Sequence, residues 1–189
     1  MHKIILASKS PRRKQLLQWA EIPFEVRSNE TDESYPENLS PQEVAIYIAK
    51  NKALAVSYRE LASSQIPILA ADTIVVVNEE IMGKPLNRSD AIKMLQKLSG
   101  KKHLVITGVV ILFNKREIAF ADITEVEFHE LTNEQIEFYV DNYKPFDKAG
   151  AYAIQEWIGV IGIKSINGDF YNVMGLPISR VLKELEKIK

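Results

Sequence analysis

The sequence predicts an α/β protein in which helices flank a mixed, twisted β-sheet. Short apolar runs alternate with helix-patterned segments in the first half, and paired strand-like runs follow in the second half. The chain has 189 residues, of which 46% are hydrophobic and 26% are charged. This size and composition suit one globular domain, or one domain with two lobes, and exclude disorder and low-complexity architecture.

The helices are predicted from their start signals and from apolar residues at helical spacing. Ser10-Pro11 combines a good N-cap with proline at the first helical position, and capping boxes stand at Ser40–Glu43 and Thr132–Gln135. Helices are expected at about residues 11–20, 40–62, 87–98, 132–140 and 177–188.

The strands are predicted from apolar runs and from alternation between apolar and polar residues. They are expected at residues 3–7, 24–27, 66–77, 103–113, 117–129, 157–166 and 171–174, and residues 81–82 are expected to pair back on the third. Residues 114–116 and Asn167-Gly168 are interpreted as hairpin turns.

Charge and cysteine content exclude several classes of protein. Lys and Arg number 24 against 25 Asp and Glu, so there is no general basic surface for nucleic acid. The absence of cysteine excludes disulfides, thiolate metal sites and cysteine nucleophiles. No apolar run is long enough to span a membrane, and the N-terminus lacks the features of a signal peptide, so a cytoplasmic protein is expected.

The segment Ser8 to Arg13 follows a strand and opens a helix. Arg12 and Arg13 stand at the positive end of the helix dipole, which is unfavourable unless an anion binds there. A phosphate site is one interpretation. Solvated arginines, or arginines paired with acidic residues of the 30–37 loop, are the alternative.

Asp72 lies within an apolar run, where an unpaired carboxylate is costly to bury. Active-site carboxylates often occupy such positions, and a structural Asp that caps a turn or pairs with a lysine is the alternative. Lys52 falls on the inward arc of its helix, where it either neutralises a phosphate or extends its head to solvent.

Three further features carry weaker signals. Lys84 and Lys148 lie in loops and by themselves suggest surface lysines. Asp32-Glu33 offers oxygen ligands for a hard cation such as Mg²⁺, although an exposed acidic loop is the commoner case. The three histidines show no ligand spacing, and the chain has no P-loop, dinucleotide fingerprint or nucleophile elbow.

Taken together, the motifs resemble those of one family, the Maf (septum-formation-like) nucleoside triphosphate pyrophosphatases. The matching segments run nearly from end to end: Leu6 to Arg13, Asp32-Glu33, Ala71 to Val75, Gly83 to Pro85, Thr107 to Val109, Asp147 to Tyr152 and Asn172 to Pro177. Each motif is weak alone, but seven in order are specific. One departure is Asp169, where the family more commonly has a small residue.

The resemblance implies a cytoplasmic enzyme that cleaves nucleoside triphosphates between the α- and β-phosphates, releasing a monophosphate and pyrophosphate. It implies an elongated mixed sheet with two lobes around a deep cleft, similar to the inosine-triphosphatase fold, over residues 1–189 as a single domain. Family members need a divalent metal, here Mg²⁺ or Mn²⁺, and are often dimeric, which is compatible with a homodimer.

The resemblance also implies roles for individual residues. Asp72, Glu33 and Lys84 match catalytic positions, and Glu33 and Asp72 are the expected metal ligands. The positions expected to bind phosphate are Ser8, Arg12, Arg13, Lys52, Lys84 and Lys148. Those expected to set base specificity are Arg12, Thr73 and Gln155.

By this resemblance, Gln155 is typical of the branch of the family that acts on dTTP and UTP. The chemical rationale is that its amide could pair with both the carbonyl and the N3–H of a pyrimidine. Modified pyrimidine triphosphates are a further expected substrate class. One alternative is the branch that acts on 7-methyl-GTP, which typically has Glu at this position, or an enzyme for modified purine nucleotides. A non-catalytic, nucleotide-sensing protein linked to cell division is the other; a nucleic-acid-binding module is disfavoured.

Overall fold

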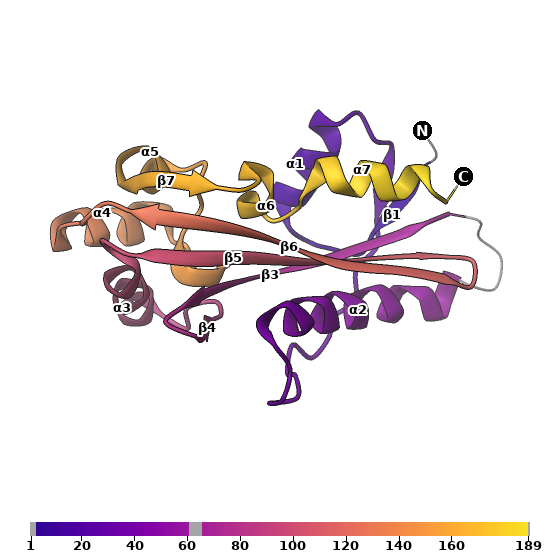
Figure 1. Ribbon diagram of the computed structural model, residues 1–189, viewed down its shortest axis with the longest axis horizontal. Coiled ribbons are helices and arrows are strands. Elements are labelled where there is room, and N and C mark those ends of the chain that lie inside the picture. Colours follow the sequence, from indigo (N-terminus) through magenta and orange to yellow (C-terminus); the bar gives the residue numbers. More distant parts are fainter. Residues whose placement is uncertain (1–2, 61–65, 189) are drawn as a thin grey trace. The chain divides into compact units, whose positions relative to one another are not determined.

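The computed structural model describes residues 3–60 and 66–188 of the chain (Figure 1). In chain order the elements are β1 (Ile4–Leu6), α1 (Pro11–Trp19), β2 (Phe24–Val26), α2 (Pro41–Glu60), β3 (Ile68–Val77), β4 (Glu80–Met82), α3 (Arg88–Leu98), β5 (Lys102–Phe113), β6 (Arg116–Phe128), α4 (Asn133–Tyr143), the 3-10 helix η1 (Ala149–Ala151), α5 (Trp157–Gly162), β7 (Ile163–Asn167), α6 (Phe170–Met174) and α7 (Ile178–Glu186).

Seven strands within the described residues form one sheet, in the order β2-β1-β3-β5-β6-β7, with β4 paired to β3. Strand β1 runs parallel to both β2 and β3, whereas the β3–β4 and β6–β7 pairs are antiparallel. A two-residue turn joins β5 to β6. The prediction of a mixed sheet flanked by helices is therefore confirmed.

The chain divides into two compact units. Unit 1 comprises residues 1–72, 107–122 and 175–189, and unit 2 comprises residues 73–106 and 123–174. Strands β3, β5 and β6 each contribute residues to both units, and the boundary in β3 falls between Asp72 and Thr73.

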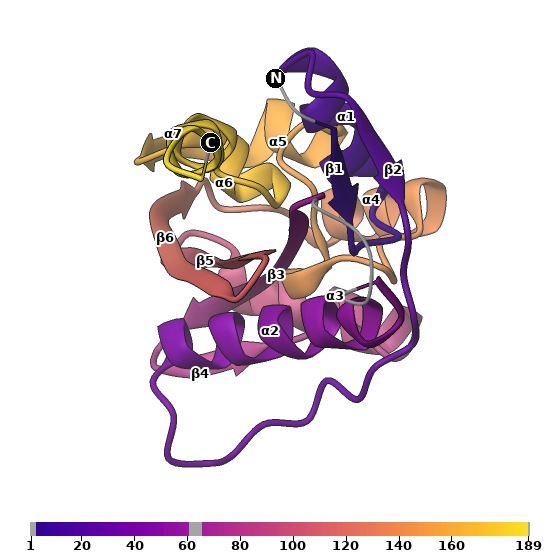
Figure 2. The same cartoon turned by 90° about the vertical axis from the view of Figure 1, so that its right-hand side faces the viewer.

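Helix α2 packs closely on the sheet of unit 1. Its inward stripe of alanines includes Ala45, Ala49 and Ala53, all fully buried, and the last two pack against apolar residues of β1, β3 and β5. A Cβ added to Gly108 of β5 would lie 2.2 Å from the backbone carbonyl carbon of Ala45. The glycine therefore permits a direct approach of helix to strand. Helices α1 and α7 cover the opposite face (Figures 1 and 2).

In unit 2, helix α3 packs against α4 and η1. The same unit holds a buried aromatic cluster in which His103 stacks on Phe128 at 5.5 Å between ring centroids, and Tyr152 meets both rings edge-on. The Tyr152 hydroxyl is 2.8 Å from His103 Nε2. This contact ties β5 to the segment that follows η1.

Predicted helix caps are present in the structure. Ser40 and Glu43 bond reciprocally, with the Ser40 N–H donating to Glu43 Oε2 at 2.8 Å and the Glu43 N–H donating to Ser40 Oγ at 3.4 Å. Thr132 and Gln135 form the second capping box, which starts α4. The expected end of α2 near Ala62 lies outside the described residues.

Three predictions for the C-terminal third are wrong. Asn167-Gly168 is not a hairpin turn, because it leads from β7 into helix α6. Residues 157–166 are not one strand, because 157–162 form α5 and only 163–167 form β7, and 171–174 belong to α6 rather than to a strand. A short apolar run does not distinguish a strand from a buried helix turn. Asp169 provides the missed signal, since its Oδ1 accepts from the Tyr171 N–H at 2.7 Å at the start of α6.

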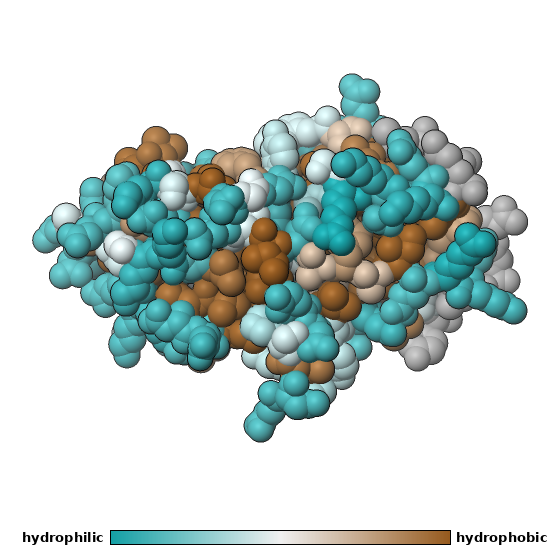
Figure 3. Space-filling model, viewed as in Figure 1, coloured by the Kyte–Doolittle hydropathy of each residue, from teal (hydrophilic) through white to brown (hydrophobic). Residues whose placement is uncertain are grey.

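Hydrophilic side chains predominate on the face shown in Figure 3, with smaller apolar patches among them. No helix in the described parts of the chain is both long and apolar enough to cross a membrane.

Candidate active site

The residues expected to bind and cleave substrate fall into two groups, one in each compact unit. Unit 1 holds Ser8, Arg12, Arg13, Glu33, Lys52 and Asp72. Unit 2 holds Thr73, Lys84, Lys148 and Gln155. Asp72 and Thr73 are consecutive residues of β3.

Lys52 is the centre of the group in unit 1. Its Nζ lies 2.5 Å from Asp72 Oδ1 and 2.8 Å from Glu33 Oε1. The side chains of Lys52 and Asp72 are only 16% and 12% exposed, whereas that of Glu33 is 44% exposed. One ammonium group therefore holds a strand carboxylate and a loop carboxylate side by side, with Glu33 on the solvent side.

Arg13 is the second cation of this group, and it is buried in α1. Its Nε donates to the Gly175 carbonyl at 2.8 Å, and its Nη1 donates to Ser8 Oγ at 3.1 Å. Burial lowers the pKa of Arg13, and the neighbouring charges of Asp72 and Glu33 oppose this shift. An arginine nevertheless stays charged in proteins, so the group keeps a fixed, oriented guanidinium.

Arg12 and Asp32 precede Arg13 and Glu33 in the chain and make different contacts from them. Arg12 is half-buried, and its charge further lowers the pKa of Arg13. The Asp32 carboxylate is directed to Ser34 instead, since it accepts from the Ser34 N–H at 2.9 Å and from the Ser34 hydroxyl at 2.7 Å. These two hydrogen bonds lower the pKa of Asp32. Of the acidic pair, Glu33 is therefore the residue directed to Lys52.

The loops of the group in unit 2 are joined to one another. The Gly150 N–H donates to the Gly83 carbonyl at 3.0 Å, so the segments that carry Lys84 and Lys148 are neighbours. Gly150 has a φ of 67°, and a Cβ added there would lie 2.9 Å from a methyl group of Val75. Glycine is thus needed for both the conformation and the close packing.

Lys148 and Gln155 differ in exposure. Lys148 is buried, and its Nζ lies 2.7 Å from Asp147 Oδ1 and 3.5 Å from Glu156 Oε1. Gln155 is exposed and stands directly before Glu156. Lys84 is exposed, and Thr73 is half-buried in β3. Glu156 therefore contacts a buried cation and directly follows the exposed Gln155 in the chain.

Sequence reasoning missed the residues that hold these side chains in place. Gly175, with a φ of 116°, presents its carbonyl to Arg13, and Gly108 lets α2 approach the sheet two turns before Lys52. Both glycines belong to motifs that were noted only for their family resemblance. A glycine in an otherwise apolar motif was the available signal, although it does not identify the partner.

The carboxylates of unit 1 are potential ligands for a divalent metal ion. Among the residues that the structure describes, no cluster of three or more His, Asp or Glu side chains is arranged to hold a metal ion. Glu33 and Asp72 supply two carboxylates on one ammonium group. Such a pair fits Mg²⁺, which is commonly bound through one or two carboxylates together with substrate phosphates.

Comparison with known proteins gives a match along nearly the whole chain. Residues 3–188 match a family model described as Maf-like protein. A dTTP/UTP pyrophosphatase of Cytophaga hutchinsonii is 52% identical over 185 residues, which cover 98% of this chain and 84% of that relative. A dTTP/UTP pyrophosphatase of Phocaeicola vulgatus is 50% identical over 188 residues, covering 99% and 96%.

Among solved structures, the Ham1 protein of Staphylococcus aureus aligns over 100% of both chains with a TM-score of 0.52 and 17% sequence identity. At this identity the similarity concerns the fold alone. It agrees with the α/β architecture described above.

Proposed function

The chain belongs to the Maf-like family, and on that premise we propose that it is a nucleoside triphosphate pyrophosphatase acting on dTTP and UTP. One water would be consumed, the anhydride bond between the α- and β-phosphates would break, and a nucleoside monophosphate and pyrophosphate would leave. The placement of Lys52 between Asp72 and Glu33 is the observation that carries this proposal.

The charges of unit 1 suit a triphosphate. Arg13 presents a guanidinium held by Gly175 and Ser8, and Lys52 presents an ammonium group to two carboxylates. A phosphate oxygen could replace one carboxylate at Lys52. Cations positioned in this way stabilise the charge that develops on the pyrophosphate leaving group more than they stabilise the ground state.

Asp72 is proposed to orient the attacking water and take its proton. Its carboxylate is buried in strand β3, and the hydrogen bond from Lys52 holds that carboxylate in place. General-base catalysis of this kind contributes about 10²–10⁴-fold to rate.

A divalent cation, Mg²⁺ or Mn²⁺, is proposed to accompany the substrate. Glu33 and Asp72 would hold it, because they are the carboxylates that Lys52 brings together. When bound, such an ion would neutralise phosphate charge during cleavage.

Base specificity is proposed to depend on Gln155, with Arg12 and Thr73 as further determinants. The two relatives are dTTP/UTP pyrophosphatases, which supports recognition of a pyrimidine with a carbonyl and an N3–H. Lys84 and Lys148 are proposed as additional phosphate ligands.

We also propose a cytoplasmic location, where nucleoside triphosphates are available, and a homodimer, which light scattering would test.

The experiment measures pyrophosphate release from dTTP, UTP, CTP, GTP and 7-methyl-GTP, with Mg²⁺ or Mn²⁺. Turnover of dTTP and UTP is expected, and Asp72→Asn should reduce it at least about 100-fold. Asp141→Asn is the matched control, because this exposed carboxylate pairs with Arg88. Turnover confined to 7-methyl-GTP would overturn the substrate assignment, and binding without turnover would overturn the activity.

A further inference from the structure

Gln155 occupies a tight turn. The Glu156 N–H donates to the Ala153 carbonyl at 3.1 Å, so residues 153–156 form a β-turn with Ile154 and Gln155 at its centre. Ile154 is buried and Gln155 is exposed. The conformation of this turn therefore sets the direction in which the Gln155 side chain leaves the backbone.

One hydroxyl group holds both ends of the turn. Tyr139 of α4 is fully buried, and its hydroxyl accepts from the Ala153 N–H at 3.2 Å. The same hydroxyl donates to Glu156 Oε2 at 2.5 Å. A phenol can donate once and accept at the same time, so Tyr139 joins the first and last residues of the turn.

The surroundings limit other movements of the turn. A Cβ added to Gly159 of α5 would lie 1.8 Å from the Ile154 carbonyl oxygen, so the helix backbone packs directly on the turn. On the preceding side, the Tyr152 hydroxyl contacts His103 Nε2. The Tyr139 hydroxyl adds a bridge between Ala153 and Glu156, the two ends of the turn.

From this geometry we propose that Tyr139 is a positioning residue for base recognition by Gln155, an inference that rests on the proposed function. A primary amide pairs with the carbonyl and N3–H of uracil in one orientation, and with N3 and the N4 amino group of cytosine when it is flipped. Discrimination between the two bases therefore requires that Gln155 be held in one orientation. Tyr139 holds the backbone from which the Gln155 side chain extends, through the N–H of residue 153 and the carboxylate of residue 156, and so keeps the amide in register with the base edge that it pairs with.

The ratio of kcat/KM for UTP to kcat/KM for CTP measures this discrimination. Because the two substrates share the triphosphate, changes in phosphate binding cancel in the ratio. Tyr139→Phe keeps the aromatic ring but removes the hydroxyl, and it should lower the ratio about tenfold. Tyr143→Phe is the matched control: Tyr143 lies one turn later, stacks on Tyr139 at 5.0 Å and is 39% exposed. It should leave the ratio unchanged.

A double-mutant cycle separates positioning from a general structural effect. If Tyr139 acts through Gln155, Tyr139→Phe should lower the ratio in the wild-type background and have no effect on it in the Gln155→Ala background. A proportional loss of kcat/KM for UTP and CTP, with an unchanged ratio, would overturn the proposal. So would a fall in the ratio that persists without Gln155, or a Gln155→Ala variant that discriminates as well as the wild type.

A second variant keeps the test valid if Tyr139→Phe fails to fold. Glu156→Ala removes the partner of the Tyr139 hydroxyl from a half-exposed position, and it should also lower the ratio only when Gln155 is present. If the wild-type enzyme releases no pyrophosphate from UTP, the proposed function itself fails. If it prefers UTP and both variants keep that preference, only the positioning role fails.

Discussion

Lys52 Nζ lies 2.5 Å from Asp72 Oδ1, although the two residues are 20 positions apart and belong to a helix and a strand. Each side chain is mostly buried, so each charge depends on the other for compensation. The same ammonium group also reaches Glu33. The ammonium group proposed to bind a substrate phosphate is therefore the same group that compensates the charges of Asp72 and Glu33. A substitution of Lys52 should for that reason affect both stability and activity.

Replacing Lys52 should lower both stability and activity. Lys52→Met leaves the buried carboxylate of Asp72 without its ammonium partner, and the free energy of unfolding should fall by about 1–3 kcal/mol. Lys50→Met, on the same helix, removes an exposed ion pair with Glu117 and should cost less than about 1 kcal/mol. Urea unfolding and pyrophosphate release compare the two. Equal losses of stability would contradict the structural account.

Arg13 should not tolerate lysine. A lysine keeps the charge but cannot donate to the Gly175 carbonyl and to Ser8 Oγ with the geometry of a guanidinium. Arg13→Lys should therefore reduce kcat/KM for UTP about 10–100-fold. Arg27→Lys, at a surface pair with Glu25, should retain wild-type activity. Full activity of the Arg13 variant would show that charge alone is sufficient.

Gly108 should be sensitive to a single methyl group. Gly108→Ala places a Cβ against the backbone of Ala45, where neither side can rotate away, and should destabilise the protein by about 1–3 kcal/mol. Activity should fall with it, since α2 carries Lys52. The stability control is Gly83→Ala, because no atom lies within 4 Å of a Cβ added there. A shift in the thermal midpoint confined to the Gly108 variant is expected, and equal midpoints would refute it.

Burial of His103 should make stability depend on pH. Burial lowers the pKa of His103 to about 4, from an ordinary value of 6.5. Between these values the unfolded chain binds a proton that the folded protein does not, so this contribution is present above pH 6.5 and is lost as the pH falls towards 4. The loss should reach about 3 kcal/mol in free energy of unfolding.

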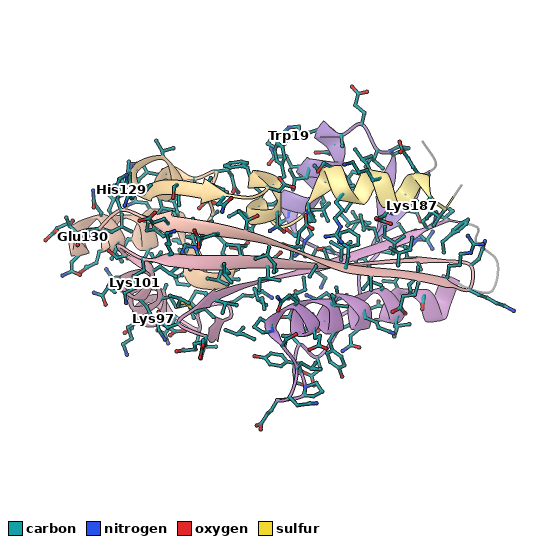
Figure 4. All side chains as sticks on the ribbon, in the orientation of Figure 1. Trp19, Lys97, Lys101, His129, Glu130 and Lys187 are labelled. Carbon is teal, nitrogen blue, oxygen red and sulfur yellow. The ribbon has the colours of Figure 1, made fainter. Side chains whose placement is uncertain are left out.

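Two histidine variants test this dependence by urea unfolding between pH 7.5 and 4.5. Every variant should lose some stability across this range, because carboxylates titrate in all of them. His103→Gln should lose less than the wild type, because it lacks the buried imidazole. His129 directly follows β6 and is exposed (Figure 4), so His129→Gln should follow the wild-type curve. Parallel curves for all three proteins would rule out the role of His103.

The glycine at position 159 offers a check on the turn that carries Gln155. Gly159→Ala would drive a methyl group into the Ile154 carbonyl oxygen and displace the turn. The ratio of kcat/KM for UTP to that for CTP should fall. Gly83→Ala again serves as control, and an undisturbed ratio in the Gly159 variant would mean that the turn does not orient the amide.

Local chemistry in the sequence was sufficient to predict many elements. The capping boxes at residues 40 and 132 could be predicted because the two partners of each box lie three residues apart. Strand β3 could be predicted because its apolar residues form one continuous run. The segment from 157 to 174 could not be predicted in this way, because its apolar residues fit either a strand or short helices. Burial against Phe128 and the hydrogen bonds of Asp169 and Asn172 decided the outcome.

The family, the residue types of the candidate site and the start of most helices could be identified from the amino-acid sequence, because they depend on short-range order along the chain. The pairing of Lys52 with Asp72, the orientation of Arg13 by Gly175 and the support of the Gln155 turn by Tyr139 became visible in the folded structure. These contacts join residues that are 14 to 162 positions apart. Their partners are set by packing of whole elements, which no local pattern specifies.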